Sequence, residues 1–119
     1  MIKGIGIDIV GVEKFKQIEN DKNFIKEILT TQEISLLRDC NNSAAYIAKM
    51  FALKEAVMKS LGWGLTYGSY WHDIEVSDEG QIKLTGVLKE QTEKMQVSKI
   101  HSSYSYSKNY VTAFVLLED

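Results

Sequence analysis

Two stretches of the sequence carry charged residues next to glycines or inside an apolar helix pattern, where they need an explanation. In GIGIDIV, near the N-terminus, Asp8 follows two glycines, and FALKEAVMKSLGWG, in the middle of the chain, contains Lys54, Glu55 and Lys59. A hard cation such as Mg²⁺ takes one or two carboxylates and completes its shell with waters and substrate phosphates. Asp8 and Glu55 are therefore a candidate metal pair, with the two lysines available to hold phosphate oxygens.

Such a site supports phosphoryl-type transfer, in which charge neutralisation and positioning take the place of a protein nucleophile. A purely structural interpretation of the same residues also stays open. Lys54 can lay its stem on apolar surface and keep its ammonium in water, and Glu55 with Lys59 has the i,i+4 spacing of a modest surface ion pair. Asp8 can equally be a solvated residue on an exposed strand face.

A strand predicted at Ile2–Val10 must position Asp8. The alternation predicts that Ile5, Ile7 and Ile9 face the core. The opposite face then presents Gly4, Gly6, Asp8 and Val10. Because glycine weakens a strand interior, two glycines beside an aspartate indicate close approach by another backbone or by a ligand.

A helix predicted from a cap at Ser43 to about Leu61 must position Glu55 and the lysines. At about 100° of rotation per residue, six apolar residues share one stripe of about 120°; they are Ile47, Met50, Phe51, Val57, Met58 and Leu61. Lys54 falls near the middle of this stripe and Glu55 at its rim. A loop predicted at Gly62–Gly68 follows, in which Gly62 and Gly64 let a ligand approach the backbone closely.

The remaining elements are shorter. Short helical segments are predicted at Lys14–Ile18, Phe24–Leu29 and Val87–Gln96. A further helix is predicted to begin at a cap at Thr30 or Thr31, with Glu33 or Glu27 as an acidic end charge, and to end at a break at Asn41–Asn42. Hairpins are predicted to pair Trp71–Val76 with Ile82–Leu84 and Lys99–Tyr106 with Tyr110–Leu117. Together these elements predict one α+β domain over residues 1–119, with a mostly antiparallel sheet, one long helix and shorter helices.

Composition excludes several classes of protein. The net charge of −2 argues against a general nucleic-acid binder. The single cysteine, Cys40, rules out an internal disulfide and a zinc site built from cysteines alone. The apolar run at the N-terminus is too short for a membrane span and lacks a small-residue cleavage site. The sequence therefore predicts a soluble cytoplasmic protein.

The strand GIGIDIV joined to the helix FALKEAVMKSLGWG resembles the holo-(acyl-carrier-protein) synthases, the small trimeric bacterial type of 4′-phosphopantetheinyl transferase. The family pattern is a G-x-D strand and an F-A-x-K-E-A-x-x-K-x-x-G helix, and both are present. The resemblance continues through ILTTQE, WHDIEV and the closing HSSYSYSKNYVTAFVLLE, so it covers nearly the whole chain in order. It implies the 4′-phosphopantetheinyl transferase fold.

The resemblance implies transfer of 4′-phosphopantetheine from coenzyme A to a serine of apo-acyl carrier protein, with release of adenosine 3′,5′-bisphosphate. It implies Mg²⁺ at Asp8 and Glu55 together with the coenzyme A pyrophosphate, and Lys59 on a cofactor phosphate. Glu55 or a metal-held water is the expected base for the serine proton. Further cofactor contacts are expected at Lys54, Gly62, Ser105 and Tyr106. A role in fatty acid biosynthesis and a homotrimer with sites at subunit interfaces are also implied.

The chain departs from the family pattern at three positions. The terminal strand usually reads H-x-S-x-S-H, and Tyr106 stands at the second histidine, while Met50 and Lys14 stand at usual arginines. A tyrosine donates a hydrogen bond but is not cationic at neutral pH. With Lys16, Lys22 and Lys26, Lys14 is expected to supply a basic edge for the acidic carrier protein.

The leading hypothesis is therefore an Mg²⁺-dependent phosphopantetheinyl transferase. One alternative is a relative that acts on a dedicated carrier domain. Another is a weakened paralogue that binds coenzyme A or a carrier protein without efficient transfer. A third is a structural trimer in which Asp8 and Glu55 serve packing.

Overall fold

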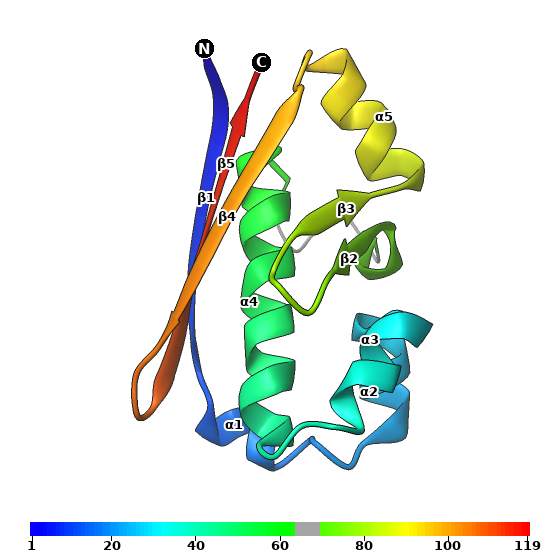
Figure 1. The fold of residues 1–119 in the computed structure, drawn as a ribbon, viewed down its shortest axis with the longest axis vertical. Helices are drawn as coiled ribbons and strands as arrows, with labels where there is room; N and C mark the ends of the chain where they lie inside the picture. Colours follow the sequence, from blue (N-terminus) through cyan, green and yellow to red (C-terminus); the bar gives the residue numbers. More distant parts are fainter. Residues whose placement is uncertain (64–69) are drawn as a thin grey trace.

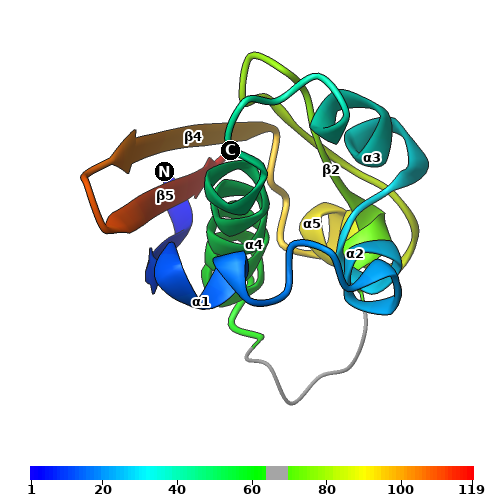
Figure 2. The ribbon, with the colours of Figure 1, turned by 90° about the horizontal axis from the view of Figure 1, so that it is seen from below.

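The computed structural model describes residues 1–63 and 70–119, and its centre is one long helix between two layers (Figures 1 and 2). The helix is α4 (Ser43–Ser60). One layer is the antiparallel sheet of β1 (Ile2–Gly11), β5 (Tyr110–Glu118) and β4 (Lys99–Tyr106), in that order. The other layer contains α2 (Lys22–Ile28), α3 (Thr31–Leu37), the hairpin β2 (Ile74–Val76) with β3 (Ile82–Leu84), and α5 (Gly86–Lys94). The antiparallel pairing of both sheets confirms the predicted α+β class.

Short elements connect these layers, with small differences from the predicted boundaries. Helix α1 (Glu13–Lys16) follows β1 directly. The strand predicted from Trp71 begins instead with a 3₁₀ turn, η2 (Trp71–Asp73), so only Ile74–Val76 pairs as strand. No helix of the described part of the chain is both long and apolar enough to cross a membrane.

Helix α4 is buried on nearly all sides, so the prediction of one apolar stripe was incomplete. Ala48, Ala52 and Ala56 lie outside that stripe and are fully buried, as Ile47 and Val57 within it are. The sheet covers one side of the helix and the second layer covers the other (Figure 2). A helix enclosed in this way is apolar all round, and its charged residues must then find partners inside the protein.

The two faces of β1 are the reverse of the prediction. A Cβ placed on Gly6 would overlap the carbonyl oxygen of Ala56, and one on Gly4 would overlap that of Ser60. The glycine face therefore packs against the backbone of α4, whereas Ile7 is 57% exposed. Alternation alone predicted the wrong face because it assigns the bulky apolar residues to the core, although here the helix leaves no room for side chains.

Gly6→Ala is expected to destabilise the fold by about 1–3 kcal/mol or more, because the added methyl meets a helix carbonyl that cannot rotate away. Urea denaturation monitored by circular dichroism measures the change in the free energy of unfolding. Gly11→Ala on the same strand is the matched control, since its Cβ would make only an ordinary contact, 3.9 Å from a ring carbon of Tyr110. Equal denaturation midpoints for the two variants would contradict this packing.

The ends of the helices are fixed by local hydrogen bonds. Asn42, rather than Ser43, caps α4 by accepting from the amide of Ala45 at 3.0 Å. At the other end Gly62 adopts φ 79°, and the amides of Gly62 and Trp63 donate to the carbonyls of Lys59 and Met58. This pattern is a Schellman termination, which favours glycine. The rest of the predicted loop, including Gly64, lies outside the described residues.

Candidate functional site

Lys59 connects the long helix to the first strand. Its Nζ donates to Asp8 Oδ1 at 2.9 Å and to the carbonyl of Ile7 at 3.0 Å. The ion pair considered between Glu55 and Lys59 is therefore replaced by one between the helix and the strand. The Lys59 side chain is 47% exposed, and an ammonium has three N–H groups. One donor thus remains for a ligand.

Asp8 and Glu55 each keep one buried oxygen without a partner. Among the described residues, Asp8 Oδ2 and Glu55 Oε1 are the buried side-chain polar atoms that have no hydrogen-bond partner. Buried carboxylate oxygens are almost always satisfied by protein, water or an ion. The two residues singled out from the sequence are therefore the two that lack a ligand in the folded chain.

The electrostatics of Glu55 indicate the kind of ligand that is missing. Burial raises the pKa of Glu55, and repulsion from the Asp8 carboxylate raises it further, while Lys59 and Lys14 act in the opposite direction. When two carboxylates share a partly desolvated site, the charge of each one makes ionisation of the other less favourable. A cation shared between them would remove this cost.

The donor set of the site fits a hard divalent cation. It offers carboxylate oxygens only, and the described residues contain no group of three or more His, Cys, Asp or Glu that could form an all-protein metal cage. Mg²⁺ typically takes one or two carboxylates and leaves its other positions to waters and substrate phosphates. Asp8 and Glu55 are therefore suitable ligands for Mg²⁺ in a site completed by phosphate.

Lys14 lies beside this site on α1. Its Nζ is 5.3 Å from the ring centres of both Phe15 and Phe51, and its charge is one of those that lower the pKa of Glu55. Lys14 is exposed. A cation held over aromatic rings at the rim of the site is available to an acidic partner.

Lys54 does not reach the surface, so the predicted snorkelling and cofactor contact are wrong. It is fully buried, and its Nζ donates to Glu33 Oε1 at 2.6 Å and to the carbonyls of Ile28 and Trp71 at 2.8 and 3.0 Å. All three N–H groups are thus used inside the protein. Burial lowers the pKa of Lys54, and the neighbouring Glu33 carboxylate acts in the opposite direction.

Glu33 is the partner that the sequence reasoning missed. Its Oε1 accepts from the amide of Thr30 at 2.9 Å as well as from Lys54, and its Oε2 accepts from the amide of Val76 at 2.7 Å. The T-T-Q-E pattern predicts a cap at Thr30 or Thr31 with Glu33 or Glu27 as the acidic end charge, and the structure has the capping box of Thr30 with Glu33. A lysine in the middle of a buried helix is the signal that could have indicated a second role, since it requires a buried counter-ion.

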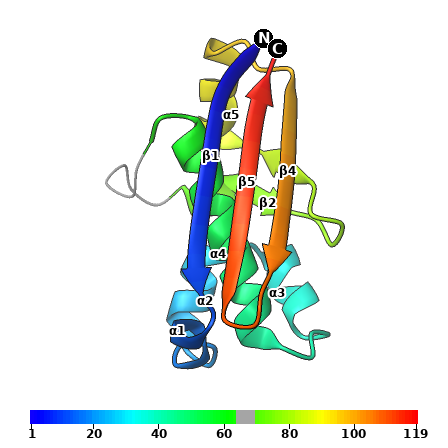
Figure 3. The ribbon, with the colours of Figure 1, turned by 90° about the vertical axis from the view of Figure 1, so that its left-hand side faces the viewer.

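The remaining predicted cofactor residues lie elsewhere in the chain. Ser105 and Tyr106 belong to β4, and Asp8 belongs to β1, so they occupy opposite edges of the sheet (Figure 3). Gly62 lies beyond the end of α4, where nothing would contact an added Cβ within 4 Å. Burial, and to a smaller extent the electrostatic effect of Tyr104, raises the pKa of Tyr106 to about 12, so its hydroxyl stays protonated. One copy of the chain therefore does not bring all predicted residues together.

Known proteins similar to this chain match it over nearly its full length. Residues 4–115 match the family described as the 4′-phosphopantetheinyl transferase superfamily. The holo-(acyl-carrier-protein) synthase of Vibrio campbellii is 35% identical over 123 residues, which cover 98% of each chain. The crystal structure of the Neisseria meningitidis synthase has a TM-score of 0.84 at 29% identity and covers 100% of both chains.

A second similar structure contains a ligand. The crystal structure of the Helicobacter pylori holo-(acyl-carrier-protein) synthase, in complex with coenzyme A, has a TM-score of 0.75 at 29% identity. It covers 96% of this chain and 99% of that chain. The similarity therefore includes the strand that carries Asp8 and the helix that carries Glu55 and Lys59.

Proposed function

The chain belongs to the 4′-phosphopantetheinyl transferase superfamily, and we infer that it transfers 4′-phosphopantetheine from coenzyme A to a serine of apo-acyl carrier protein. The full-length similarity to holo-(acyl-carrier-protein) synthases, with coenzyme A in a related crystal structure, supports both substrates. The recognition made from the two sequence motifs is thereby confirmed. Residues 1–119 are proposed to act as one transferase domain, in the cytoplasm and in fatty acid biosynthesis.

The proposed metal is Mg²⁺, held by Asp8 and Glu55. The observation that carries this proposal is the pair of unpartnered buried oxygens on these two residues. When bound, the metal supplies Lewis-acid polarisation of the phosphoryl group and offsets the charge of the leaving group.

Lys59 is proposed to bind the reacting phosphate. Asp8 and the carbonyl of Ile7 fix two of its N–H groups, so the third is oriented and donates to a pyrophosphate oxygen of coenzyme A. A positioned cation next to developing charge is worth more in a partly desolvated site than in water.

Glu55 is the candidate base of this chain. The serine oxygen attacks the pantetheine-bearing phosphorus, the bond from that phosphorus to the leaving adenosine 3′,5′-bisphosphate breaks, and the serine proton passes to the base.

The positions of the remaining candidate residues suggest where the carrier protein and coenzyme A contact the chain. Lys14, exposed beside Glu55, is proposed to attract the acidic carrier protein and to bring its serine to the site. Gly62 is proposed to leave room for the cofactor, while Ser105 and Tyr106 are proposed to contact it from the β4 edge. Since these edges are apart in one copy, a second copy is needed to complete the pocket.

A homotrimer, which the family resemblance implies, is proposed to bury the outer face of the sheet. The helices cover one face of the sheet, and no element of the described chain covers the other (Figure 3). That open face carries an apolar row of exposed residues on β1: Ile5, Ile7 and Ile9. An exposed contiguous apolar patch of this kind typically marks an interface with another protein.

Ile5→Glu is expected to reduce the assembly to single chains, because a charge at the buried centre of an interface is strongly unfavourable. Light scattering coupled to size exclusion measures the mass. Val87→Glu on α5, where the valine is 42% exposed, is the control and is expected to keep the parent mass. A parent protein that already runs as a monomer would contradict the proposed trimer.

The transfer itself is tested by incubating the protein with coenzyme A, Mg²⁺ and an apo-carrier protein and weighing the carrier by mass spectrometry. We expect the carrier to gain the mass of one phosphopantetheine group, and Lys59→Met to slow this gain by about 10²-fold. No mass gain on several carrier proteins would end the transferase assignment and favour a weakened paralogue.

A further inference from the structure

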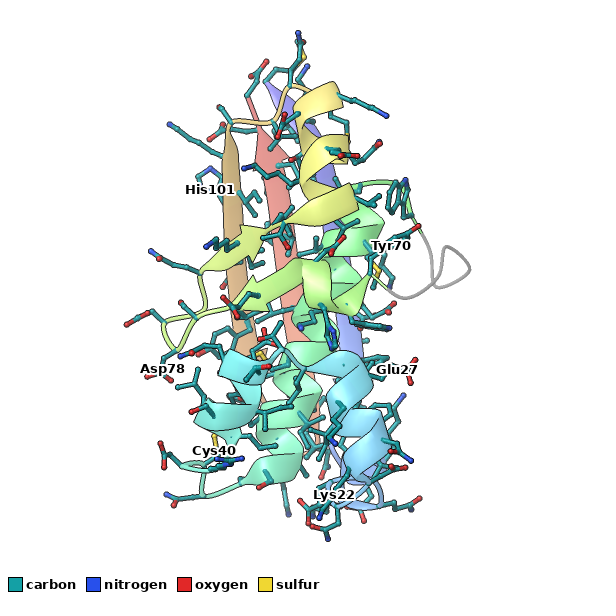
Figure 4. The ribbon with its side chains drawn as sticks, turned by 90° about the vertical axis from the view of Figure 1, so that its right-hand side faces the viewer. Lys22, Glu27, Cys40, Tyr70, Asp78 and His101 are labelled. Atoms are coloured by element: carbon teal, nitrogen blue, oxygen red, sulfur yellow. The ribbon has the colours of Figure 1, made fainter. Side chains whose placement is uncertain are left out.

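A broad groove, here called the α3 groove, lies on the side of the molecule away from the sheet. It runs between α2 and α3 on one side and the hairpin of β2 and β3 on the other, the elements that face the viewer in Figure 4. Its volume is about 1080 Å³. The residues that line it include Lys26, Thr30, Arg38, His72, Glu75 and Lys83. Because the proposed trimer would bury the outer face of the sheet, the α3 groove is left open to a partner.

Two hydrogen bonds fix the walls of the α3 groove. His72 Nε2 lies 2.6 Å from the carbonyl oxygen of Lys26, so the imidazole donates to the last turn of α2. Thr30 Oγ1 donates to Glu75 Oε1 at 3.0 Å, which holds the start of α3 against β2. The groove is therefore formed before any partner arrives, and this lowers the ordering cost of binding.

The α3 groove is positively charged, although the chain as a whole has a net charge of −2. Three cationic side chains line it: Lys26, Arg38 and Lys83. Throughout residues 1–63 and 70–119, none of the three forms an ion pair. Glu75 is the one carboxylate among the described lining residues, and it lies opposite Lys83 in the hairpin register. Two positive charges therefore remain unbalanced at this surface.

Arg38 gives the α3 groove a specific donor for acidic groups. Of the 14 lysine and arginine residues in the chain, it is the single arginine. A guanidinium is planar and binds a carboxylate through two parallel N–H groups, whereas an ammonium acts as a point charge. Threonine and serine hydroxyls line the same groove and can donate as well. The lining therefore suits a partner that carries several carboxylates.

The α3 groove is close to the candidate metal site. Phe51 on α4 stacks on Trp71 with ring centres 5.3 Å apart, and Trp71 directly precedes His72. Lys14, at the rim of the metal site, lies 5.3 Å from the centre of the same Phe51 ring. A folded domain of about 100 residues has a radius of gyration of about 13 Å, so one protein partner can cover both places.

We propose that the α3 groove is a second docking surface for the acidic carrier protein, and that Arg38 and Lys83 bind carboxylates on it while its serine occupies the site at Glu55. The proposal rests on the transferase function, which requires this partner. Charge complementarity selects the occupant, because exposed cations spread over α2, α3 and β3 match an acidic protein surface better than one small anion. Lys14 then steers the end of the carrier that holds the serine, and the groove binds a more distant part of it.

The test measures steady-state transfer with the carrier protein as the varied substrate. The double variant Arg38→Glu/Lys83→Glu is expected to raise the KM for the carrier by about 10- to 100-fold, because like charges then face each other across the interface. Its kcat and its KM for coenzyme A are expected to match the parent. The matched control is Lys89→Glu/Lys94→Glu, which makes the same change of charge at exposed positions on α5 and is expected to keep the KM within a few fold.

Charge reversal on the carrier shows whether the contact is direct. Acidic residues of the carrier are changed to lysine one at a time, and at least one change is expected to lower the raised KM of Arg38→Glu/Lys83→Glu by about 10-fold. A purely structural role of the two residues would not be rescued in this way. Urea denaturation checks folding, and Arg38→Gln/Lys83→Gln replaces the reversal if that variant does not fold, with an expected rise in KM of about 3- to 10-fold.

Calorimetric titration of the apo-carrier into the protein without coenzyme A separates this docking from the transferase function. A parent that binds the carrier without transferring, and a reversal variant that does not bind it, would refute the transferase and support the groove. Unchanged KM and unchanged carrier affinity in the reversal variant would overturn the groove and leave the transferase in place. An unchanged KM, with a melting temperature that inorganic phosphate raises only in the parent, would assign a small anion to the groove and also overturn the proposal.

Discussion

Glu55→Gln and Asp8→Asn each reduce kcat/KM for transfer by at least about 10²-fold in this account. Each substitution keeps the shape of the side chain and removes the charge that we propose binds Mg²⁺. The buried oxygens at both positions have no other partner among the described residues, so no hydrogen bond within the protein takes over their role. The measurement is the initial rate of carrier modification at saturating Mg²⁺. Glu13→Gln, an exposed residue on α1, is the control and is expected to be fully active.

Stability separates this effect from misfolding. Because the pKa of Glu55 is raised in the fold, its ionisation favours the unfolded chain as pH rises through the folded pKa. Without metal, Glu55→Gln is therefore expected to be at least as stable as the parent at neutral pH. The difference should shrink as pH falls toward the ordinary range of a glutamate. Full activity in either variant would contradict the proposed metal site.

Lys54→Met and Glu33→Gln are each expected to destabilise the protein by about 3–5 kcal/mol, because each leaves the other charge buried without its ionised partner. The pair is fully buried at 2.6 Å. Glu33 also ties the start of α3 to β2 through the amides of Thr30 and Val76. Urea denaturation measures the loss, which is expected to appear as incomplete folding if the parent has only ordinary stability.

A double-mutant cycle tests the pairing itself. The double variant Lys54→Met/Glu33→Gln is expected to be clearly more stable than the sum of the single losses predicts, since it leaves no unpaired charge. Lys16→Met, which removes an exposed partner of Glu13, is expected to change stability by less than about 1 kcal/mol. Single losses as small as that of this control would show that the buried pair is not what holds the second layer to α4.

The order and type of the elements could be predicted from the sequence because they depend on local signals. The T-T-Q-E pattern indicated a cap at Thr30 or Thr31, and Thr30 is the cap. The break at Asn41–Asn42 indicated where α4 begins, although its cap is Asn42 and not the predicted Ser43. Asp8 and Glu55 were selected as candidate metal ligands because Asp8 follows two glycines on a predicted strand and Glu55 lies at the rim of a predicted core stripe; that they bind a metal stays a prediction.

What could not be predicted depends on distances between elements. The face of β1 was assigned wrongly because only the close approach of α4 to Gly6 shows that this face has no room for isoleucine. Lys54 was also assigned wrongly, because the sequence does not show that Glu33 and the carbonyls of Ile28 and Trp71 lie within reach of its ammonium. Its place inside the protein follows from the layers that cover the helix.

The central claim is that the first strand and the long helix hold one divalent cation between Asp8 and Glu55. The most direct measurement is the anomalous difference density of Mn²⁺ in crystals of the coenzyme A complex. We predict one peak that contacts both carboxylates and the pyrophosphate, and that is absent in crystals of Glu55→Gln. A peak that touches neither carboxylate, or that is unchanged in the variant, would contradict the account.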